Sequence, residues 1–432
     1  MLPDVEVTVR DGTFDPWRGI GQPLRSDFLY PHFSRPTETE TTVTILNPVP
    51  RAAATTSHRA PRLARSVRRM TGRLVLAAGL LMGLTISPAS ASPSTTAMPG
   101  ASTDGIVFAS VQVGDRTFIG GEFTKAGQFN RLNAAAVLAN GSIDPSWNPT
   151  VNGRVRAMAA SDDGSIIYLG GMFTMVGTAS RAHLAAVDAT TGAVLQAWKT
   201  RVSSAVWSLA VSQGGLYVGG IFGTVGGNSI PNLAKLDAAT GAVDTSFRPA
   251  PTGRVRGLDL SSDGSKLYAG GGFSNIAGVD RKGIAELNAD TGAATSFDAE
   301  KGGAVIAVEL STDDSRLLFS TSDNITHAYD PAVSNTTVYE LKTSGDVQCI
   351  LEHDGEVYIG GHFGGFNQLK LTRLRLASFS LDTGVPTDWS VVVDQKMGGW
   401  TFALGPNYLS VGGAFAHIDG IRHKGYARFQ LS

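Results

Sequence analysis

The chain of 432 residues has 36 basic and 37 acidic side chains, which gives a formal net charge of −1 at neutral pH, and it contains one cysteine, Cys349. The balanced charge argues against a nucleic-acid partner, and a single cysteine excludes an intramolecular disulfide. A chain of this length without disulfides depends on a large apolar core.

The first 91 residues have the pattern of a targeting segment. Arginines between positions 62 and 73 precede an uncharged apolar run over 74–86, and small residues with A-x-A spacing follow at 89–91. This order is typical of a secretory signal peptide, and the apolar run is too short to remain in a bilayer as a spanning helix. We therefore expect a disordered or over-extended reading frame over 1–69 and a bacterial Sec-type signal peptide over 70–91, cleaved after Ala91. The product is expected to be secreted and extracellular, without a membrane span.

Residues 92–432 repeat a Gly-Gly-x-Phe block with a period of about fifty residues. The blocks begin at Gly120, Gly170, Gly219, Gly270, Gly360 and Gly412. A period of this length indicates propeller blades, and apolar runs separated by Asp-Gly and Thr-Gly turns predict four short strands in each period. The wider gap between the fourth and fifth blocks predicts a degenerate blade, in which Ser320-Thr321 replaces the glycines.

An aromatic residue at the end of the fourth predicted strand supports this division into blades. These residues are Trp147, Trp198, Phe247, Phe297, Tyr339 and Trp389. We interpret them as side chains that pack neighbouring blades together. The last period has only three strands, so we predict that residues 95–98 supply its fourth. The predicted fold is all-β: a single, monomeric seven-bladed β-propeller of four-stranded blades over 92–432, whose last blade is closed by the N-terminal strand of the mature chain.

The repeated pattern resembles a known family of repeats. Tyr-x-Gly-Gly-x-Phe, followed by Arg and then by Leu-Ala-x-Val-Asp-Ala-x-Thr-Gly, is similar to the secreted bacterial β-propeller repeats of the delta-60 type, which have kelch-like blades. The resemblance covers residues 92–432. It implies a propeller fold and an association with surface and adhesion modules, and it carries no catalytic residues with it.

A second segment, 186–192, is similar to the docking motif of quinoprotein dehydrogenases. That motif has Trp four residues after its glycine, whereas this chain has Gln196 there and Trp198 two residues later. No Gly-x-Gly-x-x-Gly stands between a strand and a helix, and the histidines of 92–432 lack the spacing of metal ligands. We therefore expect no cofactor and no metal.

Arginine recurs just before the third predicted strand of four blades, at Arg131, Arg181, Arg281 and Arg373. A group that is repeated in this way is typical of a structural role, here the capping of backbone carbonyls by guanidinium donors. The alternative is one shallow ligand pocket in each blade.

The candidate binding residues occupy a position that differs from blade to blade. Near the start of each first strand stand Phe108, Arg156, Trp207, Arg256, Ile306, Gln348 and Trp400. If the first strand is innermost, as in propellers generally, these residues ring one mouth of the central channel. Five of them are the predicted binding residues for an anionic sugar: Arg156, Trp207, Arg256, Gln348 and Trp400. Guanidinium groups hold carboxylates and aromatic faces stack on sugar rings. The alternative is that the tryptophans wedge between blades and the arginines are solvated or paired.

We predict from these features a secreted, non-enzymatic binding or adhesion propeller, whose partner is an extracellular glycan or a surface protein. No catalytic residue is assigned, because no acid, base and nucleophile converge in the sequence. The alternative is an extracellular propeller enzyme that acts on polysaccharide or sugar, as a lyase, a glycosidase or a quinoprotein-like dehydrogenase.

Overall fold

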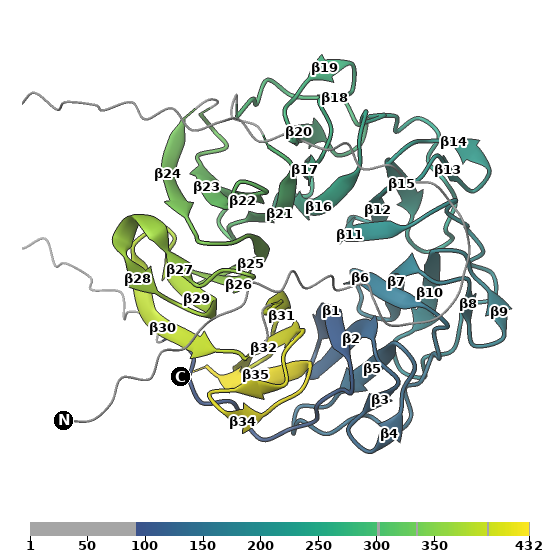
Figure 1. Cartoon of the computed structure of the whole chain (residues 1–432). Helices are drawn as coiled ribbons and strands as arrows, with labels where there is room; N and C mark the ends of the chain where they lie inside the picture. Colours follow the sequence, from purple (N-terminus) through teal and green to yellow (C-terminus); the bar gives the residue numbers. More distant parts are fainter. Residues whose placement is uncertain (1–91, 300–302, 334–335, 395–396, 432) are drawn as a thin grey trace, which may run out of the picture. The chain divides into compact units, whose positions relative to one another are not determined.

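The computed structural model describes residues 92–299, 303–333, 336–394 and 397–431, which form a ring of small antiparallel β-sheets (Figure 1). The predictions for segments 1–69 and 70–91 concern residues outside these ranges. Each sheet of three or four strands is one blade, and its first strand lies nearest the centre of the ring. The first strands are β1 (Ile106–Val113), β6 (Arg154–Ala160), β11 (Val206–Ser212), β16 (Val255–Leu260), β21 (Val305–Leu310), β25 (Val347–His353) and β31 (Gly399–Leu404).

Neighbouring first strands contact one another all the way round the ring. β1 contacts β6 on one side and β31 on the other, so the first and last blades are adjacent although they come from opposite ends of the described chain. A closed ring leaves no blade face open to solvent, which is how propellers protect their sheet edges. The described residues therefore form seven blades, as the repeat period predicts.

A short turn joins the first strand of each blade to the second, and a longer connection leads to the third strand in every blade except the fifth. The second strands are β2 (Arg116–Glu122), β7 (Ile166–Met172), β12 (Gly215–Gly220), β17 (Lys266–Gly271), β22 (Leu317–Thr321), β26 (Glu356–Gly361) and β32 (Tyr408–Gly413). The third strands are β5 (Ala134–Val137), β10 (Leu184–Asp188), β15 (Leu233–Asp237), β20 (Ile284–Asn288), β23 (Ile325–Tyr329), β29 (Arg375–Ser380) and β35 (Tyr426–Gln430). In blade 2, Asp163 Oδ1 accepts a hydrogen bond from the Ser165 N–H at 3.0 Å, and Gly164 takes the positive φ of 70° that this turn requires.

A two-stranded hairpin projects at the periphery between the second and third strands of every blade except the fifth (Figure 1). The hairpin strands pair as β3 (Lys125–Ala126) with β4 (Phe129–Asn130), β8 (Met175–Val176) with β9 (Ala179–Ser180), β13 (Thr224–Val225) with β14 (Asn228–Ser229), β18 (Asn275–Ile276) with β19 (Val279–Asp280), β27 (Gly365–Phe366) with β28 (Leu371–Thr372), and β33 (His417–Ile418) with β34 (Ile421–Arg422). The degenerate fifth blade passes from β22 to β23 without one, which accounts for its shorter loop.

The prediction of four strands in every blade is wrong for most of the ring. Regular fourth strands occur in blades 5 and 6, as β24 (Thr337–Lys342) and β30 (Pro386–Val392). In blades 1 to 4 the fourth strand shrinks to an isolated bridge, such as that between Val187 and Val194. In blade 2 the Arg181 guanidinium donates to the carbonyls of Leu195 (3.1 Å) and Gln196 (3.5 Å), which follow this bridge directly.

The N-terminal segment of the described chain runs along β35 in the last blade. The Ser94 N–H donates to the Gln430 carbonyl at 2.8 Å and the Met98 N–H to the Arg428 carbonyl at 2.7 Å. Ala97 forms an antiparallel bridge with Phe429 between these two bonds. Segment 94–98 therefore occupies the edge of blade 7 at which a fourth strand would pair.

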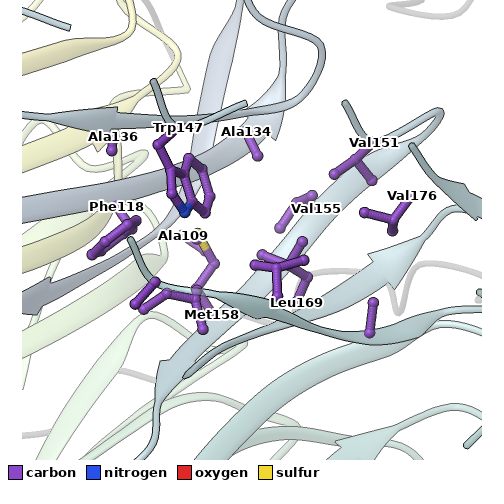
Figure 2. Close-up of a cluster of buried hydrophobic side chains, with 14 of the residues drawn as sticks. Ala109, Phe118, Ala134, Ala136, Trp147, Val151, Val155, Met158, Leu169 and Val176 are labelled. Carbon is purple, nitrogen blue, oxygen red and sulfur yellow. The ribbon is translucent and has the colours of Figure 1, made fainter. Parts of the chain in front are cut away.

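Apolar side chains fill the space between neighbouring blades, as Figure 2 shows for blades 1 and 2. Trp147 and Phe118 of blade 1 pack edge to face, with ring centroids 4.9 Å apart, beside Val155 and Leu169 of blade 2. The Trp147 Nε1–H donates to the Asp188 carbonyl of the next blade at 3.1 Å. The aromatic ladder thus packs the blades together as predicted, and truncating a fully buried tryptophan to alanine typically costs about 3–5 kcal/mol.

The paired glycines of the repeat allow close approach on both sides of the second strand. A Cβ on Gly170 would lie 2.5 Å from Val206 Cγ1 of the next blade, and a Cβ on Gly171 would lie 2.1 Å from the Arg154 carbonyl oxygen of the adjoining first strand. Both separations are too short for a side chain, so blade 2 requires glycine at these two positions.

Within the described ranges the helical structure is the single 3-10 turn η1 (Asn367–Leu369), and no helix there has the length and apolar character needed to cross a membrane.

Candidate functional site

A β-bulge interrupts every first strand at the same place. In β6, for example, pairing with β7 passes from Val155 directly to Ala157, so Arg156 has no partner across the ladder. A bulge of this kind re-aims the side chain of the extra residue. The extra residues in the seven strands are Phe108, Arg156, Trp207, Arg256, Ile306, Gln348 and Trp400.

These seven residues all line one cavity of about 520 Å³. They include every predicted binding residue: Arg156, Trp207, Arg256, Gln348 and Trp400. The structure therefore brings the predicted set together, although each residue comes from the first strand of a different blade. A volume of this size falls within the range of sites for small ligands.

Arg156 enters the cavity without a counter-ion. Its Cζ lies 4.3 Å from the ring centroid of Phe108 and 5.8 Å from that of Trp400, which are cation–π distances. Its Nε is buried and finds no hydrogen-bond partner among the described residues, none of which forms an ion pair with the guanidinium. Burial, followed by the positive charges of Arg154 and Arg256, lowers the pKa of Arg156 to about 10, so the group stays cationic at neutral pH.

Arg256 is held by a chain of hydrogen bonds that crosses from blade 4 to blade 6. Its Nη2 donates to Gln348 Oε1 at 3.4 Å, and Gln348 Nε2 donates in turn to Asp346 Oδ2. The other oxygen of Asp346 bonds to His362 Nδ1 at 2.6 Å. Burial and the nearby Arg254 lower the pKa of Arg256, and Asp346 opposes this shift. Arg256 is thus positioned by neighbours, whereas Arg156 is not.

His362 belongs to the wall behind this chain. Its ring meets the Trp400 indole edge to face at 5.7 Å between centroids. Its Nε2 is buried and lacks a hydrogen-bond partner within the described residues. A nitrogen that is covered in this way is not placed to exchange a proton with a ligand, so the geometry assigns His362 to positioning rather than to acid–base chemistry.

Two further arginines at the mouth were missed by the sequence reasoning. Arg254 lines the cavity with its Cζ 5.7 Å from the Trp207 ring, and Arg154 is neutralised by Glu122, whose Oε2 accepts from Arg154 Nε at 2.8 Å. The sequence does carry a signal for them, because the tetrapeptide Gly-Arg-Val-Arg occurs at 153–156 and again at 253–256. In each copy the second arginine is the extra residue of the bulge, and in the second copy both arginines line the cavity.

A second, apolar level of the cavity lining was also missed. Below the bulge residues the lining is made by Met158, Leu209, Leu258, Val308 and Ile350, each two positions after its bulge residue. We call these five residues the apolar floor, and their spacing follows from the two-residue period of a strand.

The arginines repeated before the third strands lie away from this cavity. Arg131 Nη2 donates to the carbonyls of Asp144 (3.0 Å) and Pro145 (2.9 Å), and Arg281 Nη2 donates to the Thr295 carbonyl (2.9 Å). These contacts are the carbonyl capping that the structural interpretation predicts.

Among the residues that the structure describes, no group of three or more His, Cys, Asp or Glu side chains is arranged to hold a metal ion. The lone Cys349 lines the cavity as a small buried residue, and burial raises the pKa of its thiol, which keeps it protonated and unreactive.

Part of the chain is similar to a known family. Residues 214–247 and 262–290 match the family model described as "Domain of unknown function (DUF5122) beta-propeller". These segments lie in blades 3 and 4 and do not include the first strand of either blade. No curated protein sequence matches the chain.

Solved structures with a similar fold include WD40 propellers. A chain in the crystal structure of a mitotic checkpoint complex superposes with a TM-score of 0.57 at 16% identity, covering 84% of this chain and 99% of that one. The WD40 β-propeller domain of Doa1 superposes with a TM-score of 0.52 at 13% identity, covering 79% of this chain and 96% of the domain. At these identities the similarity concerns the fold alone, which is an all-β, WD40-like propeller.

Proposed function

We propose that this chain is a secreted, non-enzymatic binding propeller that captures an extracellular ligand, carried by a glycan or a surface protein, through an anionic group at the mouth of the central cavity. The observation that carries the proposal is the unpaired guanidinium of Arg156. Arg156 is partly buried, so its guanidinium has lost part of its water without gaining a carboxylate partner, and an anionic ligand would supply that partner.

The surroundings of Arg156 suit such a ligand. Arg256 and Arg254 add two more guanidinium groups that line the same cavity, and Trp207 lies within 5.8 Å of both. Guanidinium forks bind carboxylates with two hydrogen bonds, and the indole offers a flat apolar surface beside them.

The test is a binding screen of glycans, polyanions and acidic peptides against the purified protein and its Arg156→Ala/Arg256→Ala variant. Removal of two charge-assisted contacts is expected to weaken binding of a responding ligand by at least about tenfold. The matched control is Arg201→Ala/Arg248→Ala, two exposed arginines outside the cavity, which should leave affinity unchanged. Equal affinity in all three proteins contradicts the proposal, and chemical conversion of the ligand by the parent protein supports the enzyme alternative instead.

Secretion is part of the same proposal. It rests on the signal-like segment 70–91 and on the resemblance to secreted repeats of the delta-60 type. N-terminal sequencing of protein recovered from the culture medium is expected to begin at Ser92, and recovery of an uncleaved chain from the cell interior contradicts it.

We further propose that segment 94–98 closes the ring as the fourth strand of blade 7. Its backbone hydrogen bonds to β35 support this, as does the Trp389 Nε1–H of blade 6, which donates to the Ser94 carbonyl at 3.4 Å. Trp147 makes the corresponding bond to the next blade around the ring.

A further inference from the structure

The central cavity has two chemically different ends. At the bulge level it presents Arg156, Arg254 and Arg256 with the faces of two tryptophans. Two residues further along each strand it presents the apolar floor, which comes from five consecutive blades. Met158, Val308 and Ile350 of the floor are buried, and Leu209 and Leu258 are partly buried.

Few polar groups near the floor are free to meet a ligand. Ser110 Oγ and Thr401 Oγ1 hydrogen-bond to each other at 2.9 Å. The Cys349 thiol donates to the Gly360 carbonyl at 3.7 Å. The exception is the Ser208 hydroxyl, which is buried and has no hydrogen-bond partner within the described residues. A ligand group that reaches the floor therefore meets mainly carbon.

This arrangement discriminates between classes of anionic ligand. A uronic acid carries hydroxyl groups around its ring, and hydroxyls pressed on the floor would lose water without gaining partners. An acid with an alkyl or aryl group beside its carboxylate buries carbon on the floor instead, which contributes about 25 cal/mol for each Å² removed from water.

We propose that the cavity binds a carboxylate that carries an apolar group on a neighbouring carbon, with the apolar group on the floor and the carboxylate at Arg156. This inference rests on the proposed function and names the ligand class of the same site. The chemistry occurs in small aliphatic or aromatic acids and at the C-terminal residue of a peptide. A cavity of about 520 Å³ holds one such residue and part of the next.

The wall of the cavity supplies an optical probe for the test. Trp207 and Trp400 line the site, whereas Trp147, Trp198 and Trp389 are fully buried between blades. Binding of N-acetyl-leucine, N-acetyl-leucinamide and glucuronate is measured by quenching of tryptophan fluorescence and by calorimetry on the purified protein. We expect N-acetyl-leucine to bind at least about tenfold more tightly than its amide, which lacks the charge, and than glucuronate, which lacks the apolar group.

A matched pair of variants on one strand tests the floor itself. Leu258 and Leu260 both lie on β16, both are partly buried and both pack on the same core cluster, but only Leu258 lines the cavity. Leu258→Ala is expected to lower the affinity for N-acetyl-leucine roughly fivefold or more, whereas Leu260→Ala should leave that affinity unchanged.

The outcomes separate this inference from the proposed function. One outcome is that glucuronate binds as tightly as N-acetyl-leucine, that Leu258→Ala leaves affinity unchanged and that Arg156→Ala weakens binding. This outcome would overturn the apolar acid as the ligand class and would support the anion site of the proposed function. If Arg156→Ala leaves the affinity for every ligand unchanged, both the apolar-acid inference and the proposed function are overturned. A peptide that ends in leucine is compared with the same peptide amidated at its C-terminus. If the peptide with a free C-terminal carboxylate binds and the amidated peptide does not, the ligand is the C-terminal residue of a peptide. If small acids bind and neither peptide binds, the ligand is a free acid.

Discussion

The carboxylates of Asp259 on β16 and Glu309 on β21 lie inside the ring, and each accepts a hydrogen bond from the backbone of the next blade. Asp259 Oδ2 accepts from the Leu310 N–H at 2.6 Å and Glu309 Oε1 from the Glu352 N–H at 3.0 Å. Burial raises the pKa of Asp259 to about 6, and burial together with the charge of Asp259 raises the pKa of Glu309 well above its usual range. The residues that join these blades are therefore also sensitive to pH.

The sign of this sensitivity follows from the direction of the shifts. Above the pKa of an unfolded carboxyl, near 4, the folded state holds protons at these sites that the unfolded chain has lost, so their contribution to the free energy of unfolding falls as the pH rises. Glu309→Gln keeps an acceptor for the Glu352 N–H and removes the charge. We expect its stability relative to the parent to increase from pH 5 to pH 7 in urea titrations.

Asp163→Asn is the control for this titration. Hydrogen bonds from Ser161 and Ser165 lower the pKa of Asp163 to about 2, so its ionisation does not change between pH 5 and pH 7. Its stability relative to the parent should be constant over that range. A Glu309→Gln difference that is also constant would contradict the buried-charge interpretation.

At the scale of an element, guanidinium groups cap backbone carbonyls in the segment that follows the third strand. Arg181 is buried and donates to three backbone carbonyls, those of Ser180, Leu195 and Gln196. Blade 3 has Ile230 at the same position and closes without a cap, because that side chain is itself buried. The position before the third strand is therefore filled either by an arginine that caps carbonyls or by a buried apolar side chain.

Removal of the cap should weaken its blade. Arg181→Ala leaves buried carbonyls without donors, and we expect a loss of about 2 kcal/mol in the free energy of unfolding, measured by urea denaturation. Arg201→Ala removes an exposed guanidinium that bonds to the Ser180 hydroxyl, and it should change stability by less than about 0.5 kcal/mol. Equal effects of the two substitutions would argue against the capping role.

At the scale of the whole molecule, the ring brings the N-terminal and C-terminal parts of the described chain together. Segment 94–98 pairs with β35, and Trp389 of blade 6 donates to the Ser94 carbonyl. Loss of this segment would expose the edge of the last blade, which is the weakest point of a propeller.

Deletion of residues 92–98 is expected to lower the Tm by roughly 5 °C or more in scanning calorimetry, since several backbone bonds and the packing of Ala97 are lost together. Addition of a synthetic peptide with the sequence of 92–98 should restore part of the loss by pairing with the vacant edge. A deletion variant with the parental Tm would show that the ring closes without this strand.

Much of the architecture could be predicted from the sequence, because a repeat places equivalent residues in equivalent environments. The period of the Gly-Gly-x-Phe blocks marks the second strands, and the aromatic ladder marks the contacts between blades. The seven residues at the mouth followed from the same alignment, since one position per blade faces a common axis. The short fourth strands did not follow, because the same Thr-Gly turn precedes the regular fourth strand of blade 6 and the single bridges of blades 2 to 4.

The sequence by itself determined the blades, the strands that face the axis and the identity of Arg156, Trp207, Arg256, Gln348 and Trp400 as neighbours. Only the tertiary structure decided that Arg256 is tied through Gln348 to Asp346 while Arg156 has no hydrogen bond or ion pair within the described residues, and that an apolar floor lies beneath them. The physical reason is that pairing, burial and charge depend on distances between blades. Residues 92 positions apart, such as Arg256 and Gln348, meet only when the ring closes.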